Sequence, residues 1–584
     1  MAEVLLSPGV LARENDQSFL QAQPVQAGAA IVGPTVKGPV GIPTLVTTYS
    51  QYQNKFGAVV ESGSAEYTYF TSISAYNYFQ QGGDSLLVTR VVSGSYTSAT
   101  STTIPDSHTS ASFVLETLSE GTNQNSSSSL GSAGQLADGT ADNIRWEIVS
   151  PNTASGTFSL LIRRGNDITT SKTVLETWGN ISLDPNATNY IEKVIGNSKQ
   201  TVTSDSSTGE YYVKNEGTYN TLSSYVRVKS VANKTLNYFD NAGNAKAAFT
   251  GSIPVASSGS FTSATGTPFV NSTAAKFYGD ISDTNTQGFD SAALGDTTTN
   301  GTYGVALNLL ANQDLYQYNL ITAPGLVKAN ATATGELTTM VTTAQTRGDN
   351  LAIVDLVNYN TTTLATVTAG ASAIDSSYAA TYWPWLQTLD PDLGGQVWVP
   401  ASTMMPGVFA FNDNSGEAWF APAGLSRGGL STVLRAERNL TNGNRNTLYQ
   451  AGVNPIATFP NAGVVVFGQK TLQKKASALD RVNVRRLLIE LKSYISQVAD
   501  NLVFEQNTIA TRNNFLSQVN PYLESVQQRQ GLYAFKVVMD DSNNTPDVID
   551  RNEMVGQIYI QPTKTAEFIY LDFNVMPTGA TFPA

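Results

Sequence analysis

A multidomain fold of the α/β type, mixed with α+β segments, is predicted by three features of the sequence. The chain has 584 residues, which is enough for several domains with a large total core. Over residues 25–95, 306–440 and 441–584, short β-branched runs alternate with helical patterns, which indicates a parallel or mixed sheet covered by helices. Residues 96–305 are instead rich in Ser, Thr, Asn and Gly, with isolated strand patterns. We therefore expect a β-rich domain inserted into an α/β core.

The first 24 residues precede this core, and two interpretations remain open for them. They are too few to bury a core of their own, so a frayed terminus is one possibility. The other is an extended N-terminal arm that adds a strand to the sheet of a neighbouring chain. The apolar residues of such a strand would be Val4, Leu5, Leu6 and Val10.

Residues 25–95 read as the first part of the α/β core. The short apolar run Ala29–Gly33 predicts a strand, and the Gly- and Pro-rich stretch after it predicts a loop. The aromatic-rich residues 65–79 predict a helix, which Gly82 and Gly83 would end. Residues 86–92 predict a second strand.

The insertion, residues 96–305, contains separate strand patterns within its polar background. They lie at residues 144–149, 158–163, 211–213 and 225–231. A short helix is expected after Asp184 and Pro185. The simplest interpretation is a β-rich surface domain with long loops, and the sequence leaves its subdivision open.

Residues 306–440 return to the α/β pattern. A strand is expected to end at Gly325, a helix to cover residues 333–346, and a buried strand to cover residues 351–356. The Pro-Trp and Trp-Phe clusters further on could form a ligand cage, but such clusters more often serve packing, which we favour.

The last segment, residues 441–584, reads as a helix laid on a sheet. Residues 463–468 enclose a V-V-V-F run that predicts a buried strand, and apolar residues at steps of three and four predict a helix over residues 484–502. Further strands are expected at residues 533–539, 555–560 and 567–574, with a polar loop that ends at Pro546.

The charge balance and the absence of cysteine exclude several classes of protein. A net charge of -12 and a pI of about 4.7 argue against a nucleic-acid binder, which should carry a basic surface. The chain has no cysteine, so disulfide scaffolds, cysteine-based zinc sites and cysteine nucleophiles are excluded. No signal peptide and no membrane-spanning helix are expected, so neither secretion nor direct membrane insertion is predicted.

The sequence predicts no catalytic, cofactor or metal site. The one histidine, His108, lies in a polar stretch that does not favour a catalytic role. No phosphate-binding glycine loop is present, so no ATP use is expected. Residues 540–547 suggest a calcium loop but lack its glycine and its last glutamate. The tripeptide that begins at Arg347 is better explained by glycine as a helix terminator than by cell adhesion.

Residues 470–492 carry seven basic and two acidic side chains, a local charge of +5 in an acidic chain. A solvated helix face is the ordinary interpretation of such a run. A contact surface for an acidic partner is the sharper one. The residues proposed for this basic patch are Lys474, Lys475, Arg481, Arg485, Arg486 and Lys492.

Several sequence blocks, in order, resemble one known family. They are V-G-P-T-V-K-G-P-V and Y-F-Q-Q-G-G-D-S-L-L-V-T-R-V near the N-terminus, Y-W-P-W and A-P-A-G in the middle, and F-P-N-A-G-V-V-V-F-G-Q-K-T-L, V-N-V-R-R-L, V-F-E-Q-N and A-E-F-I-Y-L near the C-terminus. The chain resembles the contractile tail sheath proteins of phages and of related injection particles. The resemblance covers about residues 1–95 and 306–584, and the insertion matches only locally.

The resemblance implies the following expectations. The subunit would polymerise as a helical homo-oligomer of stacked hexameric rings around a tail tube, and on a baseplate signal would contract to drive the tube through the host envelope. Its partners would be further copies of itself, the tail tube protein, and the baseplate and tail terminator proteins, with no nucleic acid and no cofactor. It would be part of the virion, assembled in the cytoplasm of the host bacterium.

The family also suggests where the functional residues lie. The basic patch would face the tail tube, and the insertion would face outward. The N-terminal arm would link subunits together with a C-terminal strand whose residues are Phe568, Ile569, Tyr570 and Leu571. Because no fuel site is expected, the energy of contraction would be stored in two alternative packings of rigid domains.

Three other functions are alternatives to this one. Within the same structural class, the chain could belong to a phage-derived bacteriocin or another injection device. A surface adhesin or receptor-binding protein would use the insertion as its binding domain and would form a discrete oligomer rather than tubes. A hydrolase would need a convergent acid/base pair, and no spacing in the sequence nominates one.

Overall fold

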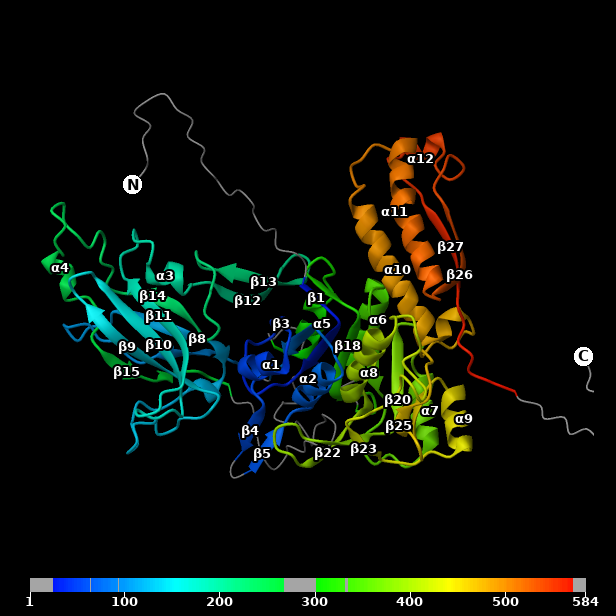
Figure 1. The fold of residues 1–584 in the computed structure, drawn as a ribbon, viewed down its shortest axis with the longest axis horizontal. Coiled ribbons are helices and arrows are strands. Elements are labelled where there is room, and N and C mark those ends of the chain that lie inside the picture. Colours follow the sequence, from blue (N-terminus) through cyan, green and yellow to red (C-terminus); the bar gives the residue numbers. More distant parts are fainter. Residues whose placement is uncertain (1–24, 63–64, 93, 267–300, 331–333, 571–584) are drawn as a thin grey trace, which may run out of the picture.

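The computed structural model describes residues 25–62, 65–92, 94–266, 301–330 and 334–570. Three parts are visible in Figure 1: a central α/β body, a β-rich lobe beside it that we call the insertion lobe, and an upright helical C-terminal lobe. The mixed α/β fold class that the sequence predicts is therefore confirmed. None of the helices in the described ranges has the length and the apolar character needed to cross a membrane.

The α/β body is built on an eight-stranded mixed sheet with the order β25-β24-β20-β19-β18-β2-β6-β3. Six neighbouring strands are parallel, and an antiparallel strand closes each edge. The strands in this order are Gly463–Val466, Asn454–Phe459, Ala379–Trp383, Leu351–Asp355, Leu320–Val327, Ala29–Gly33, Leu86–Arg90 and Thr44–Val46. The expected parallel or mixed sheet is confirmed.

Helices cover both faces of this sheet, because successive residues of a strand point to opposite sides. In β2, Ala29 and Ile31 join one buried cluster, and Ala30 and Val32 join the other. One face is covered by α1 (Tyr49–Phe56), α2 (Phe70–Gln80) and α8 (Ala401–Ser415). The other is covered by α5 (Tyr303–Leu309), α6 (Thr334–Arg347), α7 (Leu364–Ser372) and α9 (Asn442–Gln450).

Two element boundaries in the body differ from the prediction. The helix expected over residues 65–79 begins only at Phe70, because Ala65–Thr68 forms strand β5 and pairs with β4 (Val59–Ser62). The strand expected to end at Gly325 continues to Val327. Its pairing with β19 shifts between Thr322 and Val327, and Gly325 takes a positive φ of 91° there, which a glycine accepts without strain.

The insertion lobe consists mainly of two four-stranded sheets that share one core. Their orders are β11-β10-β9-β15 and β14-β8-β7-β16. The strands are β7 (Ser98–Ser101), β8 (Phe113–Glu120), β9 (Ile144–Asn152), β10 (Thr157–Arg164), β11 (Val174–Ser182), β14 (Val226–Val231), β15 (Ser257–Gly259) and β16 (Phe261–Thr262). A hairpin of β12 (Lys199–Ser204) and β13 (Tyr211–Glu216) and the short helices α3 (Ile191–Val194) and α4 (Ala247–Thr250) complete it. The four strands and the helix predicted here are confirmed.

The C-terminal lobe pairs two long helices with a β-hairpin. Helix α10 (Val482–Asp500) confirms the predicted helix, and α11 (Ile509–Gln528) follows it as a second helix that the sequence reading missed. The hairpin joins β26 (Leu532–Val538) to β27 (Gln557–Pro562), which confirms two of the three predicted strands. The stretch between them contains helix α12 (Pro546–Asp550), so Pro546 begins a helix instead of ending a loop.

The third predicted strand, at residues 567–574, is not a strand where the structure describes it. Residues 563–570 have no regular secondary structure, and the remainder lies outside the described residues. A strand needs a neighbour to receive its hydrogen bonds, and among the described residues of this chain no strand lies beside this segment.

Smaller sheets complete the body. Strands β22 (Gln396–Val399), β21 (Leu386–Leu389) and β23 (Val433–Ala436) form one antiparallel sheet, and β1 (Val25–Ala27) pairs with β17 (Tyr316–Tyr318). The aromatic clusters of the sequence pack here, since the Trp385 ring contacts both Phe70 and Tyr359 and lies in the core. These contacts agree with the packing role that we favoured for the clusters.

A buried carboxyl group at the end of β19 gives the body a testable pH dependence. Asp355 accepts hydrogen bonds from the backbone N–H of Ser402 (3.2 Å) and from its hydroxyl (2.5 Å). Burial raises the pKa of Asp355 to about 7, although these hydrogen bonds oppose the shift. The folded state then holds a proton that the unfolded state releases near pH 4, so the free energy of unfolding falls as pH rises from about 4 to 7.

We expect Asp355→Asn to remove this fall, because the amide keeps the shape and the hydrogen bonds without a charge. The free energy of unfolding of the variant minus that of the unchanged chain should therefore grow by roughly 2 kcal/mol from pH 5 to pH 8. Urea unfolding of both proteins at the two pH values measures the difference. An identical pH dependence in both proteins would show that Asp355 does not hold the proton.

Candidate functional site

The segment after β27 is the first element of the candidate site. The Thr563 hydroxyl donates to the backbone oxygens of Gln530 (2.5 Å) and Gly531 (2.9 Å), which ties the segment to the foot of the hairpin. In Figure 1 the chain then runs along the side of the α/β body and projects away from it. It therefore leaves the lobe in which it began.

The carboxylate of Glu567 fixes this segment to the body through three side chains, and we call the four residues the exit clamp. Arg481 donates from Nε to Oε1 (2.7 Å) and from Nη2 to Oε2 (3.0 Å). Gln469 donates from Nε2 to Oε1 (3.0 Å) and also to the Thr565 hydroxyl (2.5 Å). The Tyr449 hydroxyl hydrogen-bonds the same carboxylate. Three separate elements thus converge on one acidic side chain.

The electrostatics of the exit clamp favour the ionised carboxylate. Burial alone would raise the pKa of Glu567, but the hydrogen bonds from Arg481, Gln469 and Tyr449 outweigh it and lower that pKa. Burial, and after it the charge of Glu567, raise the pKa of Tyr449, so its hydroxyl remains a donor. Charge-assisted, bidentate hydrogen bonds of this kind are among the stronger polar contacts in proteins.

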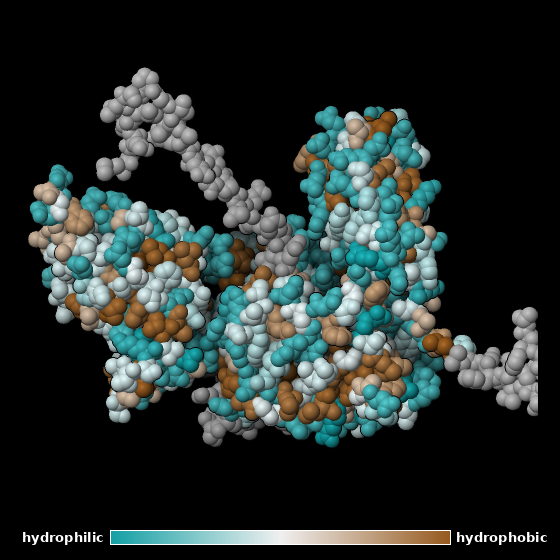
Figure 2. Space-filling model, viewed as in Figure 1, coloured by the Kyte–Doolittle hydropathy of each residue, from teal (hydrophilic) through white to brown (hydrophobic). Residues whose placement is uncertain are grey.

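Directly after the exit clamp, three large side chains face solvent. Phe568, Ile569 and Tyr570 are 69%, 75% and 89% exposed. An apolar knob is visible in Figure 2 where the described chain ends. We call these residues the exposed triplet. The other predicted linking residues, Leu571 and Val4, Leu5, Leu6 and Val10, lie outside the described residues.

The β26–β27 hairpin is a second surface of interest. In the described part of the chain, its two strands pair with each other and with no third strand. Phe535 and Ile558 pack on the α10–α11 core, while Tyr533 and Tyr559 are 62% and 57% exposed. Both outer edges can therefore accept a further strand, as unpaired sheet edges do.

The structure divides the predicted basic patch into two groups. Arg481, Arg485 and Arg486 turn inward: Arg481 binds Glu567, Arg485 lies over the ring of Tyr378 and donates to Ser377, and Arg486 forms a bidentate pair with Asp413 (2.7 and 2.6 Å). The second group is exposed and comprises Lys474, Lys475 and Lys492. The tube-facing role of the patch stays a prediction, and these three lysines are the residues that retain an exposed charge for it.

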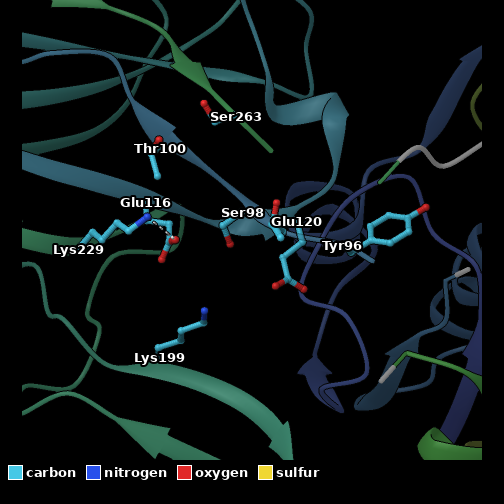
Figure 3. A pocket seen from close by; sticks show the side chains of 9 residues that line it. Tyr96, Ser98, Thr100, Glu116, Glu120, Lys199, Lys229 and Ser263 are labelled. Carbon is cyan, nitrogen blue, oxygen red and sulfur yellow. Dashed lines mark ion pairs between the residues drawn. The ribbon is translucent and has the colours of Figure 1, made fainter. Parts of the chain in front are cut away.

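A polar hollow of about 310 Å³ lies in the insertion lobe near the joint with the body (Figure 3). Glu116 on β8 is ion-paired with Arg227 and with Lys229 (3.5 Å), and Glu120 accepts a hydrogen bond from the backbone N–H of Val40 in the body. Burial raises the pKa of Glu120, and the Val40 hydrogen bond opposes the shift. Glu120 thus joins the insertion lobe to the body, Glu116 is engaged in ion pairs within the lobe, and we assign neither group any chemistry.

Comparison with known proteins identifies the family. Residues 299–472 match the central domain of phage tail sheath proteins, and residues 474–576 match the phage tail sheath C-terminal domain. Residues 299–472 and 474–576 are therefore domains of the phage tail sheath family. The body strands β18 to β25, the C-terminal lobe, the exit clamp and the exposed triplet all lie within these two sheath domains.

Two curated relatives agree with this assignment. The tail sheath protein of Vibrio phage KVP40 is 39% identical over 231 residues, which is 40% of this chain and 32% of that protein. The tail sheath protein of Enterobacteria phage T4 is 36% identical over 231 residues, which is 40% of this chain and 35% of that protein. The match thus spans about a third of the length of these relatives.

A solved structure supports the fold of the sheath family. The crystal structure of a sheath tail protein from Listeria innocua superimposes with a TM-score of 0.50 at 10% identity, covering 92% of this chain and 96% of that one. The similarity therefore extends over the insertion lobe as well as the body.

The sequence nominated the residues of the exposed triplet as linking residues, which stays a prediction, and gave no indication of the exit clamp. Tyr449, Gln469 and Arg481 precede Glu567 by 118, 98 and 86 positions, and no local pattern joins them. The one feature of the sequence that could have indicated the exit clamp was the basic run at residues 470–492. An arginine in an otherwise buried helix start needs an acceptor, and a carboxylate at residue 567 could have been considered as that acceptor.

Proposed function

We propose that this chain is the structural subunit of a contractile phage tail sheath. Copies polymerise helically, as stacked hexameric rings around the tail tube protein, and contraction drives the tube through the host envelope for genome delivery. The observation that carries the proposal is the exposed triplet at the end of a sheath C-terminal domain. Three consecutive large side chains that are exposed in the monomer mark a site of interaction with another chain. The subunit has no enzymatic role in this proposal.

Subunits are linked by exchange of strands. The C-terminal segment, with Phe568 to Tyr570, and the N-terminal arm add to the two outer edges of the β26–β27 hairpin in neighbouring copies, which no strand of the described residues occupies. Each added strand of about five residues makes a few backbone hydrogen bonds, each worth roughly 0.5–1.5 kcal/mol net. One link is modest, but a link at every subunit makes a continuous mesh that holds while subunits rotate.

Contraction draws on packing energy. The sheath assembles in an extended, metastable arrangement, and the baseplate signal releases it into a second packing of the same rigid domains. The tail terminator protein caps the far end. The exposed lysines Lys474, Lys475 and Lys492 face the tube, where screened and individually weak attractions permit sliding.

The division of the chain follows the sequence proposal. Residues 1–24 are the linking arm, residues 25–95 the first part of the core, residues 96–305 the outward-facing insertion, and residues 306–440 and 441–584 the two further sheath domains. The subunit is assembled in the cytoplasm of the host bacterium and resides in the virion. A bacteriocin or another injection device uses the same mechanism and is the alternative within this class.

Electron microscopy of the purified chain, with and without residues 1–20, tests the proposal. We expect tubes from the full chain, and rings or monomers from the truncated chain because its arm is missing. Tubes from both would retain the sheath and reject the arm as an essential link. If the full chain forms only monomers or small closed oligomers at high concentration, the sheath proposal fails and the adhesin becomes the better hypothesis.

A further inference from the structure

We infer that the exit clamp positions the C-terminal segment, so that the exposed triplet is presented to a second copy of this chain. Glu567 is the positioning residue, and Arg481, Gln469 and Tyr449 hold it. This inference rests on the proposed sheath function and adds a defined role for residues outside the linking strands. It also gives Arg481 a role different from contact with the tube.

The first step of the argument is where the holding residues come from. Tyr449 lies in helix α9, Gln469 follows strand β25, and Arg481 is the residue before helix α10. All three therefore lie in or directly next to helices and strands of the body and the start of the C-terminal lobe. The segment they hold has no regular secondary structure of its own, so the clamp is what gives it a defined path.

The second step is that this contact is stronger than an ordinary surface ion pair. Gln469 is 3% exposed, and the side chains of Arg481 and Glu567 are only 25% and 18% exposed. Two donor atoms of Arg481 reach the two carboxylate oxygens separately, which fixes the orientation of the carboxylate as well as its position. The lowered pKa of Glu567 agrees with a carboxylate that these donors stabilise.

The third step is what the clamp does to the residues after it. The described chain changes abruptly at this point, from the half-buried Glu567 to Phe568, Ile569 and Tyr570, which are 69–89% exposed. Holding residue 567 removes conformations in which the following residues lie elsewhere on the surface. Binding to a neighbour then requires less ordering of the chain, and preorganisation of this kind increases affinity without any new contact at the interface.

The path of the segment can be measured in the monomer. The chain has no cysteine, so Lys475→Cys and Ile569→Cys introduce the only two thiols, and spin labels on them report the distance between the body and the triplet. Below the assembly concentration we expect one narrow distance distribution. Adding Glu567→Ala should broaden it severalfold, and Glu567→Gln, which keeps the shape and one of the two acceptor oxygens, should broaden it less.

Assembly is measured separately, by sedimentation of the chain without labels. We expect Glu567→Ala to raise the concentration needed for tubes about tenfold, through the lost preorganisation. The thermal unfolding midpoint should fall by only a few degrees, because Arg481 keeps its ion pair with Asp480 (2.9 Å). The matched control is Glu553→Ala, which removes an exposed ion pair with Arg551 (3.0 Å) in the same lobe and should change neither readout.

Each outcome decides the inference. A narrow distribution that persists in Glu567→Ala overturns it, and so does a broadened distribution with unchanged assembly. If even the unchanged chain forms no tubes, the proposed function fails, while the spin-label result still shows whether Glu567 positions the segment. A broader distance distribution together with weaker tube assembly in Glu567→Ala supports both the positioning role of Glu567 and the proposed sheath function.

Discussion

Replacing Asp167 with alanine is expected to lower the free energy of unfolding of the insertion lobe by about 3–5 kcal/mol, the largest stability effect that we predict for a single substitution. The Asp167 side chain is fully buried, and it binds Arg163 through both oxygens, at 2.7 and 2.8 Å. Arg145 reaches the same carboxylate at 3.5 Å. The side chains of the two arginines are only 3% and 2% exposed, so the variant leaves two positive charges buried with one carboxylate fewer.

The remaining contacts cannot compensate for the lost carboxylate. Glu147 accepts from Arg163 at 2.9 Å but also holds Lys172 at 2.8 Å. Arg145 keeps its hydrogen bond to the backbone oxygen of Gly134, which carries no charge. Breaking one partner of a buried ionic network is costly because the other partner stays desolvated, whatever the net value of the intact network was.

Hydrogen exchange in strands β9 and β10 measures this effect locally, since both arginines lie on these strands. We expect their slowest amides to exchange faster in Asp167→Ala while the amides of β18 and β19 in the body remain as they were. Lys172→Ala is the matched control from the same network. Its side chain is 36% exposed, so its loss should change stability by less than about 1 kcal/mol. Equal effects of the two substitutions would contradict the argument.

Much of the α/β body could be predicted because its signals are local. The buried run of β19 and the apolar steps of α10 follow directly from side-chain periodicity. Helix α11 was missed for a local reason too. Phe515, Val519, Leu523 and Val526 have helical spacing, but Pro521 interrupts the pattern, and the helix accommodates it because packing in the C-terminal lobe outweighs one lost hydrogen bond.

The basic patch shows that a charge pattern in the sequence does not tell which of its side chains are buried and which are exposed. Arg486 and Lys492 look alike in a charge run, yet Arg486 is buried against Asp413 and Lys492 is exposed. The acceptor lies 73 positions away along the chain, and only the fold brings it near. The residues of the exit clamp are likewise far apart in the sequence, and only the fold brings them together. Charge runs therefore predict that ionic contacts exist but not whether they lie inside the subunit or between subunits.

The second large effect concerns assembly. We expect the combined substitutions Phe568→Asp, Ile569→Asp and Tyr570→Asp to abolish tubes at every concentration at which the unchanged chain forms them. An added strand places side chains on both faces of the accepting sheet, so at least one carboxylate per link would meet an apolar surface. Burying an unpaired carboxylate costs several kcal/mol, and a loss of 3 kcal/mol per link already raises the required concentration more than about a hundredfold.

The same substitutions should leave the monomer intact, which separates a defect in linking from a defect in folding. The triplet is 69–89% exposed and contributes little to the core, so stability should change by less than about 0.5 kcal/mol. Leu222→Asp is the control, because Leu222 is 65% exposed but lies in the insertion lobe, away from the linking strands. Sedimentation and thermal unfolding give both quantities. If the control blocks tubes as completely as the triplet does, general solubility explains the result; if neither does, subunits are held by surfaces other than this segment.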